Sequence, residues 1–220
     1  MGSLVVSSAP SSEPLTLSET KSFLRVDHSN DDNLITSLII ASRQFVEEHT
    51  GRGLMTQTLN LFLDGFREDE DPLFEGFRTG PYMNFYKNYI DLPRAPVQSV
   101  TSIVTFDDDD TQTTFSTANY FVESTREPAR IVLRTGSTWP TALRVASSIK
   151  VTYVVGYANA TSVPYPIKQA MLKLVANMYE QRGDMGDYLQ EREFPPMIIK
   201  LLAPYRIHKG LGTSELMAIG

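Results

Sequence analysis

The sequence predicts a mixed α+β protein, in which a small helical bundle built from both ends of the chain carries an inserted antiparallel β-domain. Apolar residues recur with a helical period near both ends, over 34–49 and 167–179. Between them, short runs of β-forming residues alternate with turns. The expected parts are a flexible N-terminal arm (1–14), the bundle (15–53 and 164–204), the β-domain (54–163) and a C-terminal tail (205–220).

The N-terminal part of the chain predicts two helices. The arm before them is rich in Ser and Pro, as flexible segments are. Thr16 and Glu19 have the spacing of a capping box and predict the start of a short first helix. Asn30 or Asp31 would cap the second helix, and Gly51 is suited to end it in a left-handed conformation.

The central part of the chain predicts strands, and the last part predicts helices again. Pro164 and Pro166 are suited to the first turn of a helix with an apolar stripe over 167–179, and Pro204 ends a last short helix over 197–202. The regular spacing of turns favours an antiparallel sheet or a small barrel-like sandwich. The expected strands are 54–63, 89–92, 97–106, 113–115, 120–123, 130–133 and 149–155.

Composition excludes several classes of protein. The 220 residues include 26 acids, 20 bases and no cysteine, which gives a formal net charge of −6. The lack of cysteine removes disulfide frameworks, thiolate metal sites and cysteine nucleophiles. The negative charge argues against a protein whose main task is to bind nucleic acid. No apolar run is long enough to span a bilayer, and the first twelve residues do not have the pattern of a signal peptide.

The negative charge is concentrated in two short stretches. The segment 64–71, which contains Glu68 and Asp69, carries a net charge of −4, and Asp107, Asp108, Asp109 and Asp110 carry another −4. The rest of the chain is therefore nearly neutral, at +2. Packed like charges repel one another, so both stretches are expected to be solvated loops.

No motif with a chemical function is complete. Asp27 and Asp31 have the spacing of a calcium loop, but the required glycine and closing glutamate are absent. The three histidines lack metal-ligand spacing, and no nucleophile elbow surrounds Ser137. Trp139 is expected to anchor a loop onto the sheet. The sequence therefore predicts no enzyme, no catalytic residue, no metal and no cofactor.

Two segments are suited to contacts with other molecules. The segment 72–89 has six aromatic residues in a loop-like context, which either pack on their own domain or meet a partner; they are Phe74, Phe77, Tyr82, Phe85, Tyr86 and Tyr89. The tail is basic and partly apolar, and it is either disordered or docks on another chain by strand addition. Its residues of interest are Tyr205, Arg206, Ile207, His208, Lys209 and Leu211.

Five segments carry a resemblance to a known family. They are PLTLSETKSFLRVDHSNDDNLITSLIIASRQFVEEHTGRGLMTQT, IDLPRAPVQSVTSI, GSTWP, VTYVVGYANATSVPYPIKQAMLKLVANMYEQRG and LLAPYRIH. In this order and spacing they resemble the phage head–tail connector (adaptor) family in its longer form, from about Pro14 to about His208. The segment 64–88 is longer and more aromatic than expected of that family.

The resemblance implies a structural virion protein of the neck. Such a protein forms a ring, commonly of twelve copies, which joins the capsid portal to the tail or to the next (stopper) protein of the neck and extends the DNA channel. Its partners are further copies of itself, the portal, the tail-side protein and passing DNA that is not specifically bound, with no membrane. It is assembled in the host cytoplasm and resides at the head–tail junction.

The resemblance also implies a role for the C-terminal tail, which would dock on the portal. Two further hypotheses come from the residues and not from the resemblance. The 72–89 aromatics would contact a neighbouring subunit or the next neck protein. If the acidic loops face the channel, they would repel DNA and keep it from sticking. The alternative from another class is a small β-rich module that binds a ligand or carbohydrate through its aromatic loop.

Overall fold

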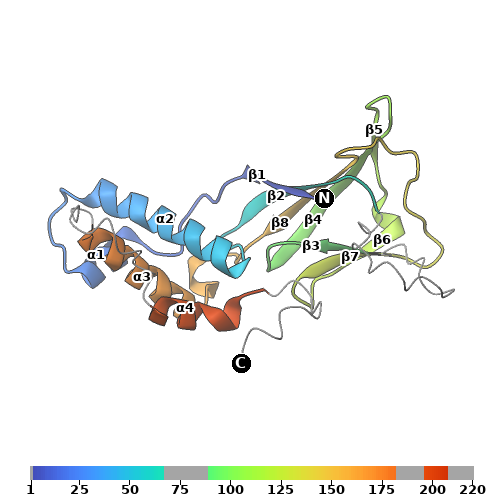
Figure 1. The fold of residues 1–220 in the computed structure, drawn as a ribbon. Helices are drawn as coiled ribbons and strands as arrows, with labels where there is room; N and C mark the ends of the chain where they lie inside the picture. The colour runs from blue at the N-terminus through green and yellow to red at the C-terminus, as the bar shows by residue number, and fades with distance from the viewer. Residues whose placement is uncertain (1, 67–88, 182–195, 208–220) are drawn as a thin grey trace, which may run out of the picture. The chain divides into compact units, whose positions relative to one another are not determined.

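The computed structural model describes residues 2–66, 89–181 and 196–207. The chain divides into two compact units, which are described separately below (Figure 1). One unit, the β unit, is formed by Met1–Ala9 and Gln57–Val155, and the other, the helical unit, by Pro10–Thr56 and Gly156–Gly220. The described residues contain four α-helices and two antiparallel sheets. The mixed α+β class predicted from the sequence is confirmed.

The β unit consists of a five-stranded and a three-stranded sheet. The first has the strand order β1-β2-β8-β4-β5, and the second has the order β3-β7-β6. The strands of the first sheet are β1 (Ser3–Ser8), β2 (Gln57–Leu63), β8 (Ile149–Val155), β4 (Val97–Phe106) and β5 (Gln112–Thr114). Those of the second sheet are β3 (Tyr89–Leu92), β7 (Ala129–Leu133) and β6 (Tyr120–Glu123).

Alternating side chains build the core of the β unit. Along β8 every second residue is buried, from Ile149 to Val155, because successive side chains point to opposite faces of a sheet. The neighbouring strands supply Leu59 and Ile103 to the same cluster. Tyr153 is buried in it, and its hydroxyl donates to the carbonyl oxygen of Pro93 at 2.7 Å. Burial raises the pKa of Tyr153, so the phenol stays neutral and keeps this hydrogen bond.

Strand β1 lies where the sequence predicts a flexible arm. It pairs antiparallel with β2, with Leu4 opposite Leu61 and Val6 opposite Leu59. All six of its side chains are exposed. The strand is therefore held by backbone hydrogen bonds to β2 and not by burial of its side chains. For this reason the sequence of β1 has no alternating apolar pattern that would predict a strand.

Four aromatic rings close one side of the β-unit core. Trp139 stacks on Phe66 with ring centroids 4.2 Å apart and touches Phe115 at 5.2 Å, and Phe115 lies 6.0 Å from Tyr120. Trp139 lies in a segment without regular secondary structure and is 9% exposed. The expectation that it anchors a loop onto the sheet is confirmed.

The helical unit contains α1 (Leu17–Leu24), α2 (Asp32–Thr50), α3 (Tyr165–Glu180) and α4 (Pro196–Leu202). Thr16 caps α1 by accepting from the Glu19 N–H at 3.1 Å, and Gly51 ends α2 with φ of 70°, both as predicted. Asp31 occupies the N-cap of α2 but makes no side-chain cap bond. Its carboxylate instead accepts from the hydroxyl of Tyr179, which ties the start of α2 to α3.

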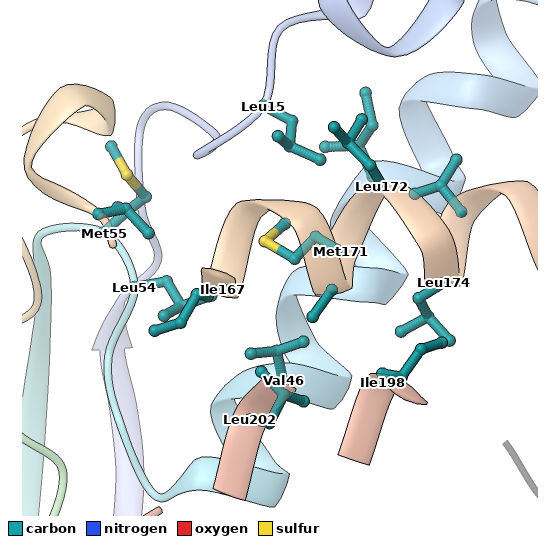
Figure 2. Packing of buried hydrophobic residues seen from close by; sticks show 14 of the residues in the cluster. Leu15, Val46, Leu54, Met55, Ile167, Met171, Leu172, Leu174, Ile198 and Leu202 are labelled. Carbon is teal, nitrogen blue, oxygen red and sulfur yellow. The ribbon is translucent and has the colours of Figure 1, made fainter. Parts of the chain in front are cut away.

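Apolar side chains from all four helices or their flanks form the core of the helical unit. Val46 of α2, Met171 and Leu174 of α3, and Ile198 and Leu202 of α4 are buried in one cluster. Figure 2 shows these side chains gathered where α2, α3 and α4 meet. Each fully buried side chain of this size contributes about 1.5–3 kcal/mol to folding. No helix in the described ranges is long and apolar enough to cross a membrane.

A buried ionic network fixes the end of α2 in the helical unit. Arg43 and Glu47, 6% and 5% exposed, are joined at 2.8 Å. The guanidinium also donates to Glu13 at 2.7 Å, and Glu47 accepts from the backbone N–H of Leu54 at 2.7 Å. One pair of charges therefore holds together the segment before α1, the helix α2 and the segment after it.

Gly156 lies where the chain leaves the β unit. Its φ is +102°, and a Cβ at this position would lie 2.0 Å from the carbonyl oxygen of Met55. Only glycine allows the backbone to pass Met55 at this distance.

Candidate functional site

The start of the predicted tail is packed against the helical unit. Tyr205 is half-buried against the helical core, and its carbonyl oxygen accepts from the Nε of Arg52. The N–H of Ile207 donates to the carbonyl oxygen of Thr50 at 2.8 Å, just before the turn that ends α2. Arg206 is exposed between these two anchor points.

This arrangement divides the tail residues into two groups. Tyr205 and Ile207 are bound to their own subunit, so the described part of the tail is not free to leave it. His208, Lys209 and Leu211 lie outside the described residues. Sequence reasoning missed the anchor, because a backbone bond across more than 150 residues leaves no local pattern.

The second acidic stretch forms a tight turn between β4 and β5. Asp107 stabilises the turn, because its Oδ1 accepts from the backbone N–H groups of Asp109 and Thr111 at 3.1 and 2.8 Å. Asp110 has a left-handed backbone with φ of 59° and forms an ion pair with Arg144 at 2.7 Å. Asp108, Asp109 and Asp110 are exposed, as expected of a solvated loop.

The segment 144–148 contacts both acidic stretches. Arg144 binds Asp110, and the backbone N–H of Ser147 donates to Oδ1 of Asp64, the first acid of the other stretch, at 2.8 Å. The hydroxyl of Ser148 donates to the carbonyl oxygen of Asp64 at 2.9 Å. The hydrogen bond from Ser147 holds the pKa of Asp64 below its usual range. The structure thus brings together parts of two acidic stretches that are more than 40 residues apart in the sequence.

Most other predicted contact residues fall outside the described part of the chain. This holds for Glu68 and Asp69 and for the aromatic residues Phe74, Phe77, Tyr82, Phe85 and Tyr86. Tyr89, the last aromatic of that segment, begins β3, and the guanidinium of Arg130 lies 5.1 Å from its ring centroid. In the described ranges, no three His, Asp or Glu side chains are grouped so that they could hold a metal ion.

A family comparison gives these surfaces a context. Residues 14–105 match the family described as phage gp6-like head-tail connector protein. The chain is therefore similar to this family over 92 of its 220 residues. By this description, the proteins of the matched family are head–tail connectors of phage. The family resemblance stated from the sequence is confirmed.

Solved structures share the fold of this chain over nearly its whole length. It matches a chain from the neck of an empty gene transfer agent (GTA) particle, computed with C6 symmetry, at 21% identity and a TM-score of 0.72, covering 96% of this chain and 98% of the other. It matches a chain of the virion of the native GTA particle at 20% identity and a TM-score of 0.71. This match covers 95% of this chain and 97% of the other. It also matches a chain from the neck of the native GTA particle, computed with C12 symmetry, at 20% identity and a TM-score of 0.70. This match covers 96% of this chain and 98% of the other. No curated protein matches the chain.

Proposed function

We propose that this protein is a head–tail connector that forms a closed ring of twelve identical copies. The similar necks were computed with C6 and C12 symmetry, and both are compatible with twelve copies. The ring joins the capsid portal to the tail or to the next protein of the neck and extends the DNA channel. The observation that carries the proposal is the family match over residues 14–105 together with the shared fold of the neck chains.

A ring constrains how its subunits meet. Copies related by a rotation use a heterologous interface, so one face of each subunit must fit a different face of its neighbour. Partners therefore include other copies of this chain as well as the portal and the tail-side protein. The segment 72–89 is proposed to take part in such contacts, either with a neighbouring copy or with the next neck protein.

The tail after Ile207 is proposed to hold the portal. Because Tyr205 and Ile207 are anchored to Arg52 and Thr50, portal contacts are assigned to residues from His208 onward, with Lys209 and Leu211 among them. The anchor fixes the place at which this segment leaves its own subunit. The basic and partly apolar composition of the segment suits a protein surface with acidic and apolar groups.

The acidic stretches are proposed to face the DNA channel. In a ring of about twelve copies the formal charge is on the order of −70, and the two stretches account for all of this negative charge because the rest of each chain is slightly positive. Like charges on the wall would repel the DNA phosphates and let DNA pass without binding. The contacts of segment 144–148 with Asp64 and Asp110 support a shared acidic surface. Finding Asp107–Asp110 on the outer surface of an assembled ring would overturn this assignment.

Sedimentation with phage heads tests the proposal. The connector should sediment with heads that contain the portal and stay in the supernatant with heads that lack it. Equal amounts bound to both kinds of head would contradict the proposed place in the particle. A monomer in solution without heads would not, because a portal can template the ring.

A further inference from the structure

We propose that neighbouring copies in the ring are joined by strand addition: β1 of one copy pairs with the outer edge of β4 in the next copy. The inference rests on the proposed ring and names the surfaces that close it. Each copy would contribute both edges of its five-stranded sheet, so that the sheets continue from one subunit to the next.

Strand β1 is suited to donate one edge. It is the edge strand of its sheet, and its sequence SLVVSS contains no charge and no proline. Leu4, Val5 and Val6 are 36%, 47% and 54% exposed. Natural edge strands usually carry lysine or proline, which block unwanted pairing. An uncharged apolar edge without this protection is typical of a strand that has a partner.

The other edge of the same sheet offers an acceptor. Strand β5 pairs only with the end of β4, from Val104 to Phe106. Within the described residues, Ser99, Val100 and Ser102 of β4 pair with β8 on one side, with a register shift between Val100 and Ser102, and no strand pairs with this segment on the other side. This segment also has no charge and no proline.

The two edges lie at the same level of the sheet. Two rows of directly paired residues run from β1 through β2 and β8 to β4. One row is Val6, Leu59, Tyr153 and Val100, and the other is Val5, Asn60, Thr152 and Ser102. Copies in a ring are related by rotation with no shift along the axis, so surfaces that meet must share a height. When the strands lie parallel to the ring axis, β1 and β4 residues of the same row lie at the same height, so the two edges can meet.

The strand directions also fit. Every pairing from β1 to β4 is antiparallel, so β1 runs opposite to β4. A rotation about an axis along the strands preserves these directions. The part of β1 from Val5 to Ser8 in the next copy would therefore add antiparallel to the segment from Ser99 to Ser102 of β4. The added strand ends at Val5 because the next positions of β4, Ile103 and Val104, already pair with Phe115 and Thr114.

Side-chain chemistry agrees with the register set by the rows. Val6 would lie beside Val100, on the face that carries the buried Leu59 and Tyr153, and both valines would lose water-exposed surface. On the opposite face Val5 would lie beside Ser102. The contact thus extends the apolar face of one subunit onto the next.

A lysine on β1 tests the contact. Val6→Lys changes a side chain that is 54% exposed, so the monomer should fold, but at every ring interface the lysine would be buried beside Val100 as an unpaired charge. We expect the amount of ring on portal-containing heads to fall on the order of a hundredfold. Val145→Lys is the matched control, because Val145 is a 91% exposed valine of the same unit, and it should assemble as the unchanged protein does.

Introduced cysteines test the register, and the natural chain has none to interfere. Val5 and Ser102 of one copy lie three strands apart, roughly 14 Å, which is too far for a disulfide. In the proposed contact they lie on adjacent strands of two copies, within reach. Oxidised rings of the V5C/S102C variant should give a ladder of covalent oligomers, whereas each single variant and V145C/S102C should not.

The outcomes separate this inference from the proposed function. If the unchanged protein forms rings while V6K assembles normally and V5C/S102C gives no ladder, the strand contact is wrong and the ring stands. If the unchanged protein forms no ring on portal-containing heads, the proposed function itself fails. Loss of assembly in V6K together with the covalent ladder supports the contact.

Discussion

Replacing Glu47 with alanine should destabilise the helical unit by about 3 kcal/mol. The carboxylate is 5% exposed and accepts from Arg43 and from the backbone N–H of Leu54. Without it, the buried N–H of Leu54 loses its acceptor, at a cost of about 1–3 kcal/mol. Arg43 also loses one of its two carboxylates, which in a fully buried pair would cost about 3–5 kcal/mol.

The remaining partner of Arg43 limits the second cost. Glu13 stays 2.7 Å from the guanidinium, and its side chain is partly exposed, so part of the charge remains compensated. Glu47→Gln should cost only about 1 kcal/mol, because the amide oxygen can still accept from Leu54. The matched control is Glu48→Ala, which removes an exposed carboxylate one position along α2 and should change stability by less than about 0.5 kcal/mol.

Urea unfolding measured with two probes checks this prediction. Far-UV circular dichroism follows the helices, and the fluorescence of Trp139, the only tryptophan, follows the β unit. The Glu47→Ala variant should shift the helical transition to lower urea and shift the Trp139 transition less. Equal stability of the Glu47→Ala and Glu48→Ala variants would refute the role given to the buried network.

Three further predictions concern other parts of the chain. Gly156→Ala should prevent stable folding, since its Cβ would overlap the carbonyl group of Met55. Gly136→Ala is the control: Gly136 has a φ of +86° and a Cβ there would meet no atom within 4 Å, so the substitution should cost only about 1 kcal/mol of stability. Thermal unfolding of the two variants tests the difference. A chain ending at Ile207 should keep its circular dichroism spectrum and lose binding to portal-containing heads; retained binding would contradict the tail assignment. Because the pKa of Asp64 is lowered in the folded protein, its carboxylate stabilises the fold at pH values above its usual pKa and loses that effect as the pH falls through the lower folded pKa. An NMR titration measures the folded pKa. Asp64→Asn should remove this part of the acid dependence of stability.

Local patterns predicted much of the secondary structure. The capping box at Thr16, the helical stripe that becomes α2 and the alternation in Ile149–Val155 are each encoded within a few neighbouring residues. Trp139 was assigned to a loop that packs on the sheet because a large apolar ring beside proline in a turn-rich segment needs a place to be buried.

Features that depend on distant partners could not be predicted in the same way. Strand β1 has no buried face, so only its backbone pairing with β2 reveals it. The cap role of Asp31 was half correct, because the position is the N-cap but the carboxylate binds Tyr179, which is 148 residues away. The Arg43–Glu47 pair did have a local signal in its i,i+4 spacing, but that spacing does not reveal burial.

The same limit applies to the candidate surfaces. Sequence grouped the acids into two stretches, and the structure adds that segment 144–148 contacts both. Sequence treated the tail as one piece from Tyr205, whereas Ile207 is bonded to Thr50. The anchoring of Tyr205 and Ile207 is a tertiary property, since it depends on residues at the end of α2.

Electron microscopy of the connector bound to portal-containing heads, processed without imposed symmetry, tests the central claim most directly. The account predicts a closed ring of connector density directly below the portal, with a central channel continuous with that of the portal. Connector density that is absent from this position, or that is present there as isolated subunits with no ring, would contradict it.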